Sequence, residues 1–356
     1  MGEAEQRDGQ SSASRRRRAT RADVARLAGV STAVVSYVFN NGPRPVAPET
    51  ARRVRSAAEK LDYRPNSVAR ALSTGSSRTL GVIVPDLSNP FFSDVYGELE
   101  SIASHSGYSA LFMASHQNPS KEQNRIARLI AREVDAIIVA SARPASELSS
   151  IPRKECPFVF LDQTRPVPGA KCVSTDFQSA VESAVRHLLG HGHTAIAMLS
   201  GKAGDGLADP RIQGWQRVHE QAGITAGPVI DAGFTRQGGY EAMLALLDSG
   251  RCPGAVFADS DLEAIGALRA LHERHIRVPE DVALVSFDGT VDSAFSWPPL
   301  TVVRQDAHAI AERIFHASVE PDRVPDLQLV AASLVARRSC GCDDDSRTTS
   351  SPGSSV

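Results

Sequence analysis

Residues 21–40 combine side chains and spacing that suit the recognition of DNA. Ala25 is small enough to lie where two helices cross, Gly29 can adopt the positive φ of a tight turn, and Ser31 can cap a following helix. Five apolar positions flank the turn at helical spacing: Val24, Ala28, Val30, Val35 and Val38. The pattern predicts a helix-turn-helix whose second helix enters the major groove. An ordinary pair of packed helices is the alternative.

A third helix, beginning at Pro48, is expected to complete this small helical head. Its apolar stripe consists of Val54, Ala57, Ala58 and Leu61. Three arginines elsewhere on the same helix can reach phosphate groups: Arg52, Arg53 and Arg55. From Arg15 to Arg78 the chain carries fourteen basic residues against four acidic ones, a net of +10, although its total formal charge is −2. This distribution predicts a polyanion partner for the first part only, and the helix-turn-helix indicates that this partner is double-stranded DNA.

Beyond residue 78, apolar strands alternate with amphipathic helices. The expected strands are Leu80–Val84, Ala110–Ala114, Ala136–Ala140, Phe158–Leu161, Ala195–Leu199, Ala255–Phe257 and Ala283–Phe287. The expected helices are Phe91–His105, Glu122–Arg132, Phe177–His191, Arg211–Ala222, Gly239–Ser249 and Asp261–His275. Such alternation is typical of parallel sheets covered on both faces, and the length suits two α/β lobes that face a cleft.

Polar side chains near the ends of these strands can hold a small ligand, because α/β sheets bind ligands at the carboxyl ends of their strands. Arg211 offers a rigid fork of donors, and Asp261 offers two acceptors. Apolar walls can come from Phe91, Phe92 and Phe234. The mixture suits a polyol such as a sugar, with a nucleobase as the other class considered. Alternatively, Arg211 and Asp261 form a cap or a surface ion pair, and Phe91 and Phe92 belong to the core.

The composition excludes several other classes of protein. The chain has 356 residues, 42% of them hydrophobic and 22% charged, which is ordinary for a globular protein of about two domains. The first thirty residues lack the apolar segment of a secretory signal, and no run of about eighteen apolar residues occurs. Five scattered cysteines indicate reduced thiols, so we expect a cytoplasmic protein.

Neither metal binding nor catalysis is expected. Cys340 and Cys342 lie in a polar tail without histidines nearby in the sequence, and His187, His191 and His193 have no cysteine or carboxylate grouped with them. The chain contains no nucleophile elbow, no P-loop and no Gly-x-Gly-x-x-Gly after a strand. We therefore expect no metal, no cofactor and no enzyme activity.

The stretch ADVARLAGVSTAVVSYVFN, followed by VAPETARRVRSAAEKLDYRPNSVARAL, resembles the lactose-repressor (LacI/GalR) family of bacterial transcriptional regulators. The resemblance continues to about Arg338 through residues 85–92, 211–215, 261–267, 286–289 and 298–306. It implies a small all-α helix-turn-helix head plus a two-lobed α/β effector domain with parallel sheets, similar to type I periplasmic sugar-binding proteins. It also implies a homodimer on a pseudo-palindromic operator.

Site residues follow from the exposed face of the second helix, from the ligand chemistry and from this resemblance. The expected DNA-binding residues are Thr20, Ser31, Thr32, Ala33, Ser36, Tyr37, Asn40, Asn66, Ala69 and Leu72. The expected effector-binding residues are Asn89, Phe91, Phe92, Asp162, Arg211, Phe234, Asp261 and Gln305. The resemblance implies that residues 66–73 form a hinge helix on the operator and that Leu72 wedges into a minor-groove step. Leu72 packed on the body is the alternative, and Asp288 is expected to hold the hinge.

Two departures from the family pattern leave the operator sequence open. Tyr37 stands where many members have arginine, and the loop at residues 41–45 is one residue longer than in the lactose repressor.

The expected domains are a disordered tail (1–18), the head (19–65), a hinge helix and linker (66–77), the effector-binding and dimerisation domain (78–338) and a disordered tail (339–356). We expect a repressor controlled by a small effector, with a sugar as the expected class. A solute-binding protein without DNA function is the alternative.

Overall fold

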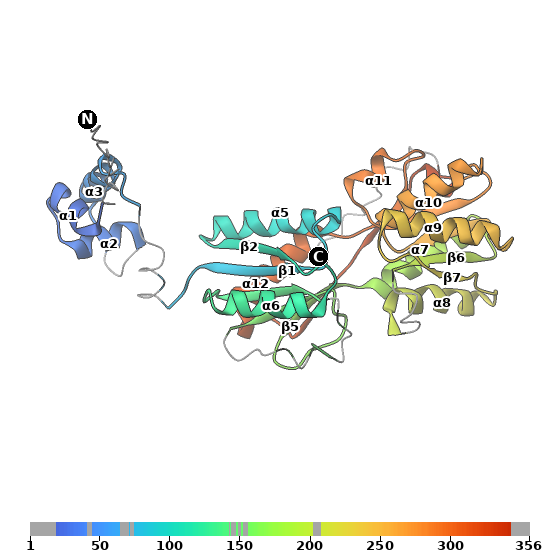
Figure 1. Ribbon diagram of the computed structural model, residues 1–356, viewed down its shortest axis with the longest axis horizontal. Coiled ribbons are helices and arrows are strands. Elements are labelled where there is room, and N and C mark those ends of the chain that lie inside the picture. The colour runs from blue at the N-terminus through green and yellow to red at the C-terminus, as the bar shows by residue number, and fades with distance from the viewer. Residues whose placement is uncertain are drawn as a thin grey trace, which may run out of the picture. The chain divides into compact units, whose positions relative to one another are not determined.

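The structure, a computed structural model, describes residues 19–40, 45–64, 71, 75–141, 143, 147–148, 151, 156–201 and 208–342. The chain divides into two compact units between Ser77 and Arg78. The first unit is helical, and the second contains two sheets flanked by helices (Figure 1). The predicted fold, a helix-turn-helix head plus a two-lobed α/β domain, is therefore confirmed.

Among the described residues of the first unit, three helices have defined bounds: α1 (Arg21–Ala28), α2 (Thr32–Asn40) and α3 (Pro48–Lys60). They enclose a small apolar core in which Val24, Val35 and Val54 are completely buried. Ala25 is also buried, as its small side chain predicts for a helix crossing.

Among the described residues no single helix is long and apolar enough to cross a membrane. The stretch from α1 to Phe39 has the required length and composition only as a pair of helices that is bent by 104°.

Local capping interactions fix the turn between α1 and α2. The hydroxyl of Thr20 accepts the backbone N–H of Asp23, and the Asp23 carboxylate accepts the backbone N–H of Thr20 at 2.9 Å. Gly29 ends α1 with φ at 66°, where a Cβ would be strained. The hydroxyl of Ser31 accepts the N–H of Val34 at 3.3 Å and so caps α2. The predicted turn and cap are both present.

The first lobe of the second unit is a six-stranded parallel sheet. Its strands are β1 (Thr79–Val84), β2 (Ser109–Ala114), β3 (Ala136–Ala140), β4 (Phe158–Leu161), β5 (Lys171–Thr175) and β11 (Leu327–Val330), in the order β11-β5-β4-β3-β1-β2. Its helices are α5 (Pro90–His105), α6 (Pro119–Ile130) and α12 (Ala307–Val319). Because side chains alternate along a strand, Val82 packs towards α5 and α12, whereas Ile83 packs towards α6.

The second lobe repeats this plan with one antiparallel edge. Its strands are β6 (Ile196–Ser200), β7 (Val229–Asp231), β8 (Ala255–Ala258), β9 (Ala283–Asp288), β10 (Thr301–Arg304) and β12 (Ser333–Val335), in the order β12-β10-β9-β8-β6-β7. Only β12 runs antiparallel, to β10. Its helices are α7 (Phe177–Gly190), α8 (Pro210–Ala222), α9 (Arg236–Asp248), α10 (Asp261–Glu273) and α11 (Val291–Phe295). One face packs on α7 and α8, and the other on α9 and α10.

The chain passes between the lobes three times: after β5, between β10 and α12, and between β11 and β12. Gln305 lies on the second passage and is buried. The hydroxyl of Thr175, at the end of β5, donates to its side-chain oxygen, and its amide nitrogen donates to the carboxylate of Asp288 at 2.8 Å. One polar side chain therefore connects the strand ends of the two sheets.

Short strands account for most differences from the predicted elements. Five strands of three to five residues each were not predicted: β5, β7, β10, β11 and β12. The helices α11 and α12 were not predicted either. Three-residue strands show too little periodicity to be recognised, and their position depends on the neighbouring strand with which they pair. The longer strands are present, with ends that differ by one residue at most.

The carboxyl-terminal residues require a correction. Residues 339–342 were assigned to a disordered tail, but Arg338–Cys340 form a 3₁₀ helix in which Ser339 and Cys340 are buried. The hydroxyl of Ser339 donates to the carbonyl of Leu284 in β9 and accepts the N–H of Thr301 in β10 at 2.8 Å. A polar composition concealed this segment, because its polar atoms bond to strands rather than to water. Residues 1–18 and 343–356 lie outside the described residues.

Gly214 provides a test of the packing between α7 and α8. A Cβ at this position would lie 2.5 Å from the backbone oxygen of Gln178. Gly214→Ala is expected to separate the two helices and to lower stability by about 1–3 kcal/mol. Gly97→Ala in α5, where an added Cβ meets no atom within 4 Å, is expected to raise stability by up to about 1 kcal/mol. Thermal unfolding followed by circular dichroism compares them, and shifts of the same sign and size would contradict the close approach.

Candidate functional site

The predicted DNA-recognising face lies on α2. Five expected contact residues are exposed or half-buried on this helix and its cap: Ser31, Thr32, Ala33, Ser36 and Tyr37. The helix carries no charged side chain, so short polar groups and one phenol are left to recognise base edges. Asn40 is the last residue of α2. Three further expected residues lie outside the described part of the chain: Asn66, Ala69 and Leu72.

Basic side chains of the head lie on α3 rather than on α2. A hollow between α1 and α3 is lined by Leu27, Ala28, Arg52, Arg53, Ser56, Ala57 and Lys60. Arg52 forms an ion pair with Glu49, and both side chains are exposed. Thr20, an expected contact residue, is exposed and caps α1 through Asp23. Exposed basic groups around a neutral helix suit phosphate contacts that position the protein while the helix recognises the sequence.

The guanidinium of Arg211 is the centre of the second candidate site. Arg211 is the second residue of α8 and is only 9% exposed. Its Cζ lies 3.8 Å from the ring centroid of Phe177 and 5.5 Å from the ring centroids of Phe234 and Phe287. Aromatic faces stabilise a desolvated guanidinium and leave its in-plane N–H groups available to acceptors. Arg211 is therefore buried and does not form a surface ion pair, and its contact with an effector stays a prediction.

Carboxylates compensate this buried charge. Oδ2 of Asp209 lies 3.8 Å from Nη1 of Arg211, and Oδ1 accepts the backbone N–H of Arg211 at 2.7 Å. Burial lowers the pKa of the guanidinium, but four negative charges outweigh this effect and raise the pKa. They belong to Asp209, Asp259, Asp162 and Asp288. Nε of Arg211 is buried and has no hydrogen-bond acceptor among the described residues. Such a donor suits a ligand that carries hydroxyl groups.

Three residues near this guanidinium have left-handed backbone conformations. The φ angles are 63° for Asp162, 53° for Phe234 and 97° for Asp288. In residues other than glycine this conformation is strained and concentrates at functional sites. The backbone N–H of Phe234 donates to the carboxylate of Glu263 at 2.9 Å and holds the strained residue in place. The Phe234 ring packs closely on Gly201, where a Cβ would overlap it.

Asp261 is the first residue of α10, and both of its carboxylate oxygens accept hydrogen bonds from other residues of the chain. Oδ1 accepts the hydroxyl of Ser286 at 2.6 Å, and Oδ2 accepts the N–H and the hydroxyl of Thr290 at 2.6 and 2.8 Å. Burial raises its pKa to about 6. Burial and the charge of Asp261 likewise raise the pKa of Asp288 to about 8. Asp261 thus fixes the loop after β9, and its contact with an effector stays a prediction.

The expected residues of the first lobe lie at the start of α5. The side chain of Asn89 caps this helix by accepting the N–H of Phe91 at 3.0 Å. Phe91 and Phe92 are buried in the apolar core with ring centroids 5.4 Å apart, so their effector role stays a prediction. The buried hydroxyl of Tyr96 has no hydrogen-bond partner among the described residues, and burial and the charge of Asp162 raise its pKa. This phenol is therefore a further candidate contact.

Several residues around Arg211 were not predicted. They are Phe177, Asp209, Asp259 and Phe287. A sequence signal existed for the two carboxylates, since Asp259 directly follows β8 and Asp209 precedes a proline at a helix start. No such signal marked the two phenylalanines, because a phenylalanine that lines a site has the same sequence pattern as one in the core.

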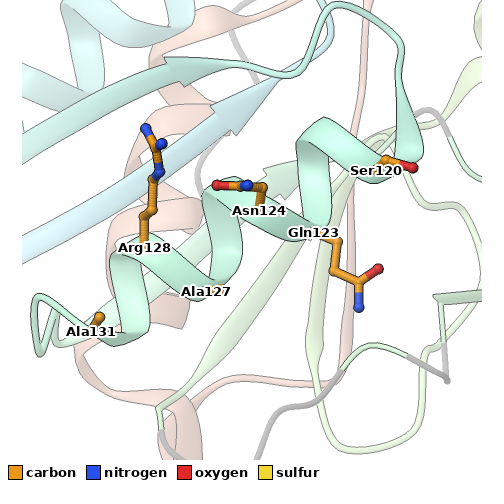
Figure 2. A pocket seen from close by; sticks show the side chains of 6 residues that line it. All are labelled: Ser120, Gln123, Asn124, Ala127, Arg128 and Ala131. Atoms are coloured by element: carbon orange, nitrogen blue, oxygen red, sulfur yellow. The ribbon is translucent and has the colours of Figure 1, made fainter.

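A surface hollow on α6 is distinct from this set of residues. It is lined by Ser120, Gln123, Asn124, Ala127, Arg128 and Ala131 (Figure 2). These side chains recur every three or four positions and lie on one exposed face of the helix. The lining contains no aromatic ring and no expected effector residue. The ligand chemistry found around Arg211 is therefore not repeated on α6.

The fold and the two sites define a DNA-binding regulator with a ligand-binding body. Residues 20–66 match bacterial regulatory proteins of the lacI family, and residues 185–340 match the periplasmic binding protein-like domain. The HTH-type transcriptional regulator GalR of Escherichia coli strain K12 is 37% identical over 327 residues, which are 90% of this chain and 95% of that protein. The chain belongs to the LacI family of bacterial regulatory proteins.

Solved structures support the same assignment. The lac repressor dimer bound to operator and the anti-inducer ONPF is similar with a TM-score of 0.77 and 28% identity, over 90% of this chain and 99% of that one. A complex of the transcriptional regulator CelR with cellobiose has a TM-score of 0.64 and 26% identity, over 90% and 100% of the two chains. The resemblance inferred from the sequence is confirmed, and a solute-binding protein without DNA function is not supported.

The raised pKa of Asp288 predicts a pH dependence of stability. In the folded chain this carboxyl has a pKa of about 8, against an ordinary value of 3.8. The unfolded chain therefore loses this proton first, and stability falls as the pH rises from about 4 to 8. Asp288→Asn cannot ionise and is expected to show a smaller fall in Tm between pH 5 and pH 8 than the wild type.

The exposed Asp231, changed to Asn, is the matched control. It is expected to retain the wild-type fall in Tm, which differential scanning calorimetry measures at both pH values. A fall as large in Asp288→Asn as in the wild type would contradict the raised pKa.

Proposed function

We propose that this protein represses transcription and that a small polyol, a sugar, bound at Arg211 controls its affinity for operator DNA. The observation that carries the proposal is the buried guanidinium with an Nε donor that no described acceptor uses. A sugar offers hydroxyl oxygens to such donors, hydroxyl protons to the surrounding carboxylates and a C–H face to the half-buried Phe234 ring. The related CelR structure holds cellobiose, which supports this ligand class.

Control of the operator follows from the way the lobes are joined. Asp162 comes from the first sheet, whereas Asp209, Asp259 and Asp288 come from the second lobe. A ligand that contacts both sides favours one angle between the lobes over another, and Gln305 is the polar link at which the angle changes. The difference in ligand affinity between the two arrangements sets the size of the response.

We further propose a homodimer that acts in the cytoplasm, where chromosomal DNA is available. Three large apolar side chains of α11 and the turn after it are exposed: Val291 by 63%, Phe295 by 85% and Trp297 by 81%. A second copy of the chain would cover them. The similar lac repressor structure is a dimer, which supports this occupant. We propose no enzyme activity, so the effector binds without turnover.

A salt-titrated binding assay tests the main proposal. The purified protein is titrated with its own upstream DNA and with scrambled DNA, with and without a panel of sugars and nucleobases. Preference for the upstream DNA, a steep loss of affinity as salt rises and a shift caused by one sugar are expected. Equal weak binding to both DNAs would contradict operator recognition. A response to nucleobases alone would contradict the sugar.

Two head variants separate base recognition from phosphate contact. Tyr37→Ala on α2 is expected to weaken binding to the upstream DNA by roughly tenfold or more and to leave binding to scrambled DNA unchanged. Arg53→Ala is expected to weaken binding to both DNAs and to reduce the salt slope by about one. Fluorescence anisotropy measures both, with effector affinity as the control for folding. Equal losses on both DNAs for Tyr37→Ala would place this side chain outside the recognition surface.

Arg211→Lys tests the effector site because it keeps the charge and removes the planar fork of donors. The effector concentration needed for half response is expected to rise roughly tenfold to a hundredfold, with operator affinity in its absence unchanged. Arg217→Lys is the matched control, since Arg217 lies on the same helix, is 56% exposed and pairs with Glu182. An unchanged response in Arg211→Lys would exclude Arg211 from the site.

A further inference from the structure

Four potential metal ligands from distant parts of the sequence meet at the end of α7. The ligand atoms of His187, His191, Cys340 and Cys342 all lie within 4.8 Å of one another. No metal was expected from the sequence, because about 150 residues separate these histidines from these cysteines. The fold removes this separation by placing the carboxyl-terminal 3₁₀ helix beside the last turn of α7. The expectation of isolated histidines and cysteines is therefore wrong.

The distances between these ligand atoms suit a tetrahedral site. Nε2 of His187 lies 3.2 Å from Sγ of Cys340 and 3.7 Å from Sγ of Cys342, and Nε2 of His191 lies 3.3 Å from Sγ of Cys342. Around tetrahedral zinc, Zn–S bonds of about 2.3 Å and Zn–N bonds of about 2.0–2.1 Å place nitrogen and sulfur about 3.5 Å apart. These three distances need to change by only a few tenths of an ångström, whereas ligand atoms as far apart as 4.8 Å must approach each other by about 1 Å when an ion binds.

The backbone directs the four ligand side chains towards one another. His187 and His191 are four residues apart and therefore lie on one face at the end of α7, with ring centroids 4.8 Å apart. The two cysteines flank Gly341, whose φ of 96° is strained for any other residue. This turn presents both sulfur atoms to the imidazoles. The hydrogen bonds of Ser339 to β9 and β10 anchor the segment.

The chemistry of the donors favours zinc. Two thiolates and two neutral imidazoles form the ligand set of structural zinc sites, whereas hard ions such as Mg²⁺ prefer oxygen. The hydroxyl of Thr301 lies 3.0 Å from Sγ of Cys340 and adds a polar contact to this sulfur. The exposed His191 leaves a route for the ion from solvent.

We propose that His187, His191, Cys340 and Cys342 bind one Zn²⁺ ion per chain as a structural site. With four protein ligands no coordination position remains for a substrate, so the site has a structural rather than a catalytic role. It would join the carboxyl-terminal segment to α7, the helix that begins with Phe177 beside Arg211. This assignment is independent of the proposed response to a sugar.

Cobalt substitution gives a direct test on the full-length, untagged and fully reduced protein. Co²⁺ is titrated into the chain after treatment with a chelator. The expected result is one equivalent bound per chain, with the strong visible d–d bands of tetrahedral Co²⁺ and a near-ultraviolet thiolate-to-cobalt charge-transfer band. Added Zn²⁺ is expected to bleach both, since it binds such sites more tightly than Co²⁺. Absence of both bands in the wild type would overturn the proposal.

Single variants assign the ligands. His191→Gln and Cys342→Ser change residues that are exposed or half-buried and are expected to weaken Co²⁺ binding by roughly a hundredfold or more. His193→Gln and Cys252→Ser are the matched controls, because they alter a neighbouring histidine and a distant cysteine and are expected to bind as the wild type does. Unchanged cobalt spectra in both ligand variants would place the ion elsewhere and overturn the proposal.

Two further readouts distinguish a metal site from hydrogen-bonded side chains or a Cys340–Cys342 disulfide. Zn²⁺ is expected to protect these two thiols, and not Cys252, from alkylation by iodoacetamide, as peptide mass spectrometry measures. It is also expected to raise the Tm of the wild type and not that of Cys342→Ser. Equal alkylation of all cysteines with and without Zn²⁺ in reduced protein would contradict metal binding.

Discussion

The buried positive charge of Arg211 constrains the arrangement of the second unit. A buried ion costs several kcal/mol unless opposite charges and aromatic faces compensate it, and Arg211 has both. The compensating carboxylates lie directly after β4 and β8, at the last residue of β9 and at the cap of α8. The carboxyl ends of strands in both sheets must therefore converge on one guanidinium. Three of the surrounding residues accept strained backbone conformations in this arrangement.

The same carboxylates connect ligand chemistry to movement of the lobes. Asp288 faces Arg211 and also accepts the amide of Gln305, which in turn accepts the hydroxyl of Thr175 from the other sheet. A change of charge near the Arg211 guanidinium therefore also affects the hydrogen bonds of Asp288 and Gln305, which join the two lobes. Small changes of this kind are amplified when a packed structure has two discrete arrangements. The proposed effector site and the polar link between the lobes thus share Asp288.

Local rules explain why the head was predicted well. The turn requires a glycine at Gly29, a cap at Ser31 and a small residue at Ala25, and all three requirements act within a few residues of one another. Arg211 was found for a similar reason, since it stands at the start of a helix in a matched segment. The aromatic partners of its guanidinium were missed because Phe177 and Phe287 satisfy the pattern of core residues equally well.

The helix-turn-helix, the alternation of strands and helices and the membership of the LacI family could be predicted from the sequence, because each depends on neighbours along the chain. Which strand ends meet and which side chains share a site became known only from the folded structure. The three passages between the lobes and the strand order bring together residues more than a hundred positions apart, such as Thr175 with Gln305 and His187 with Cys340. Contacts at that distance depend on how elements pack, which periodicity along a chain does not record.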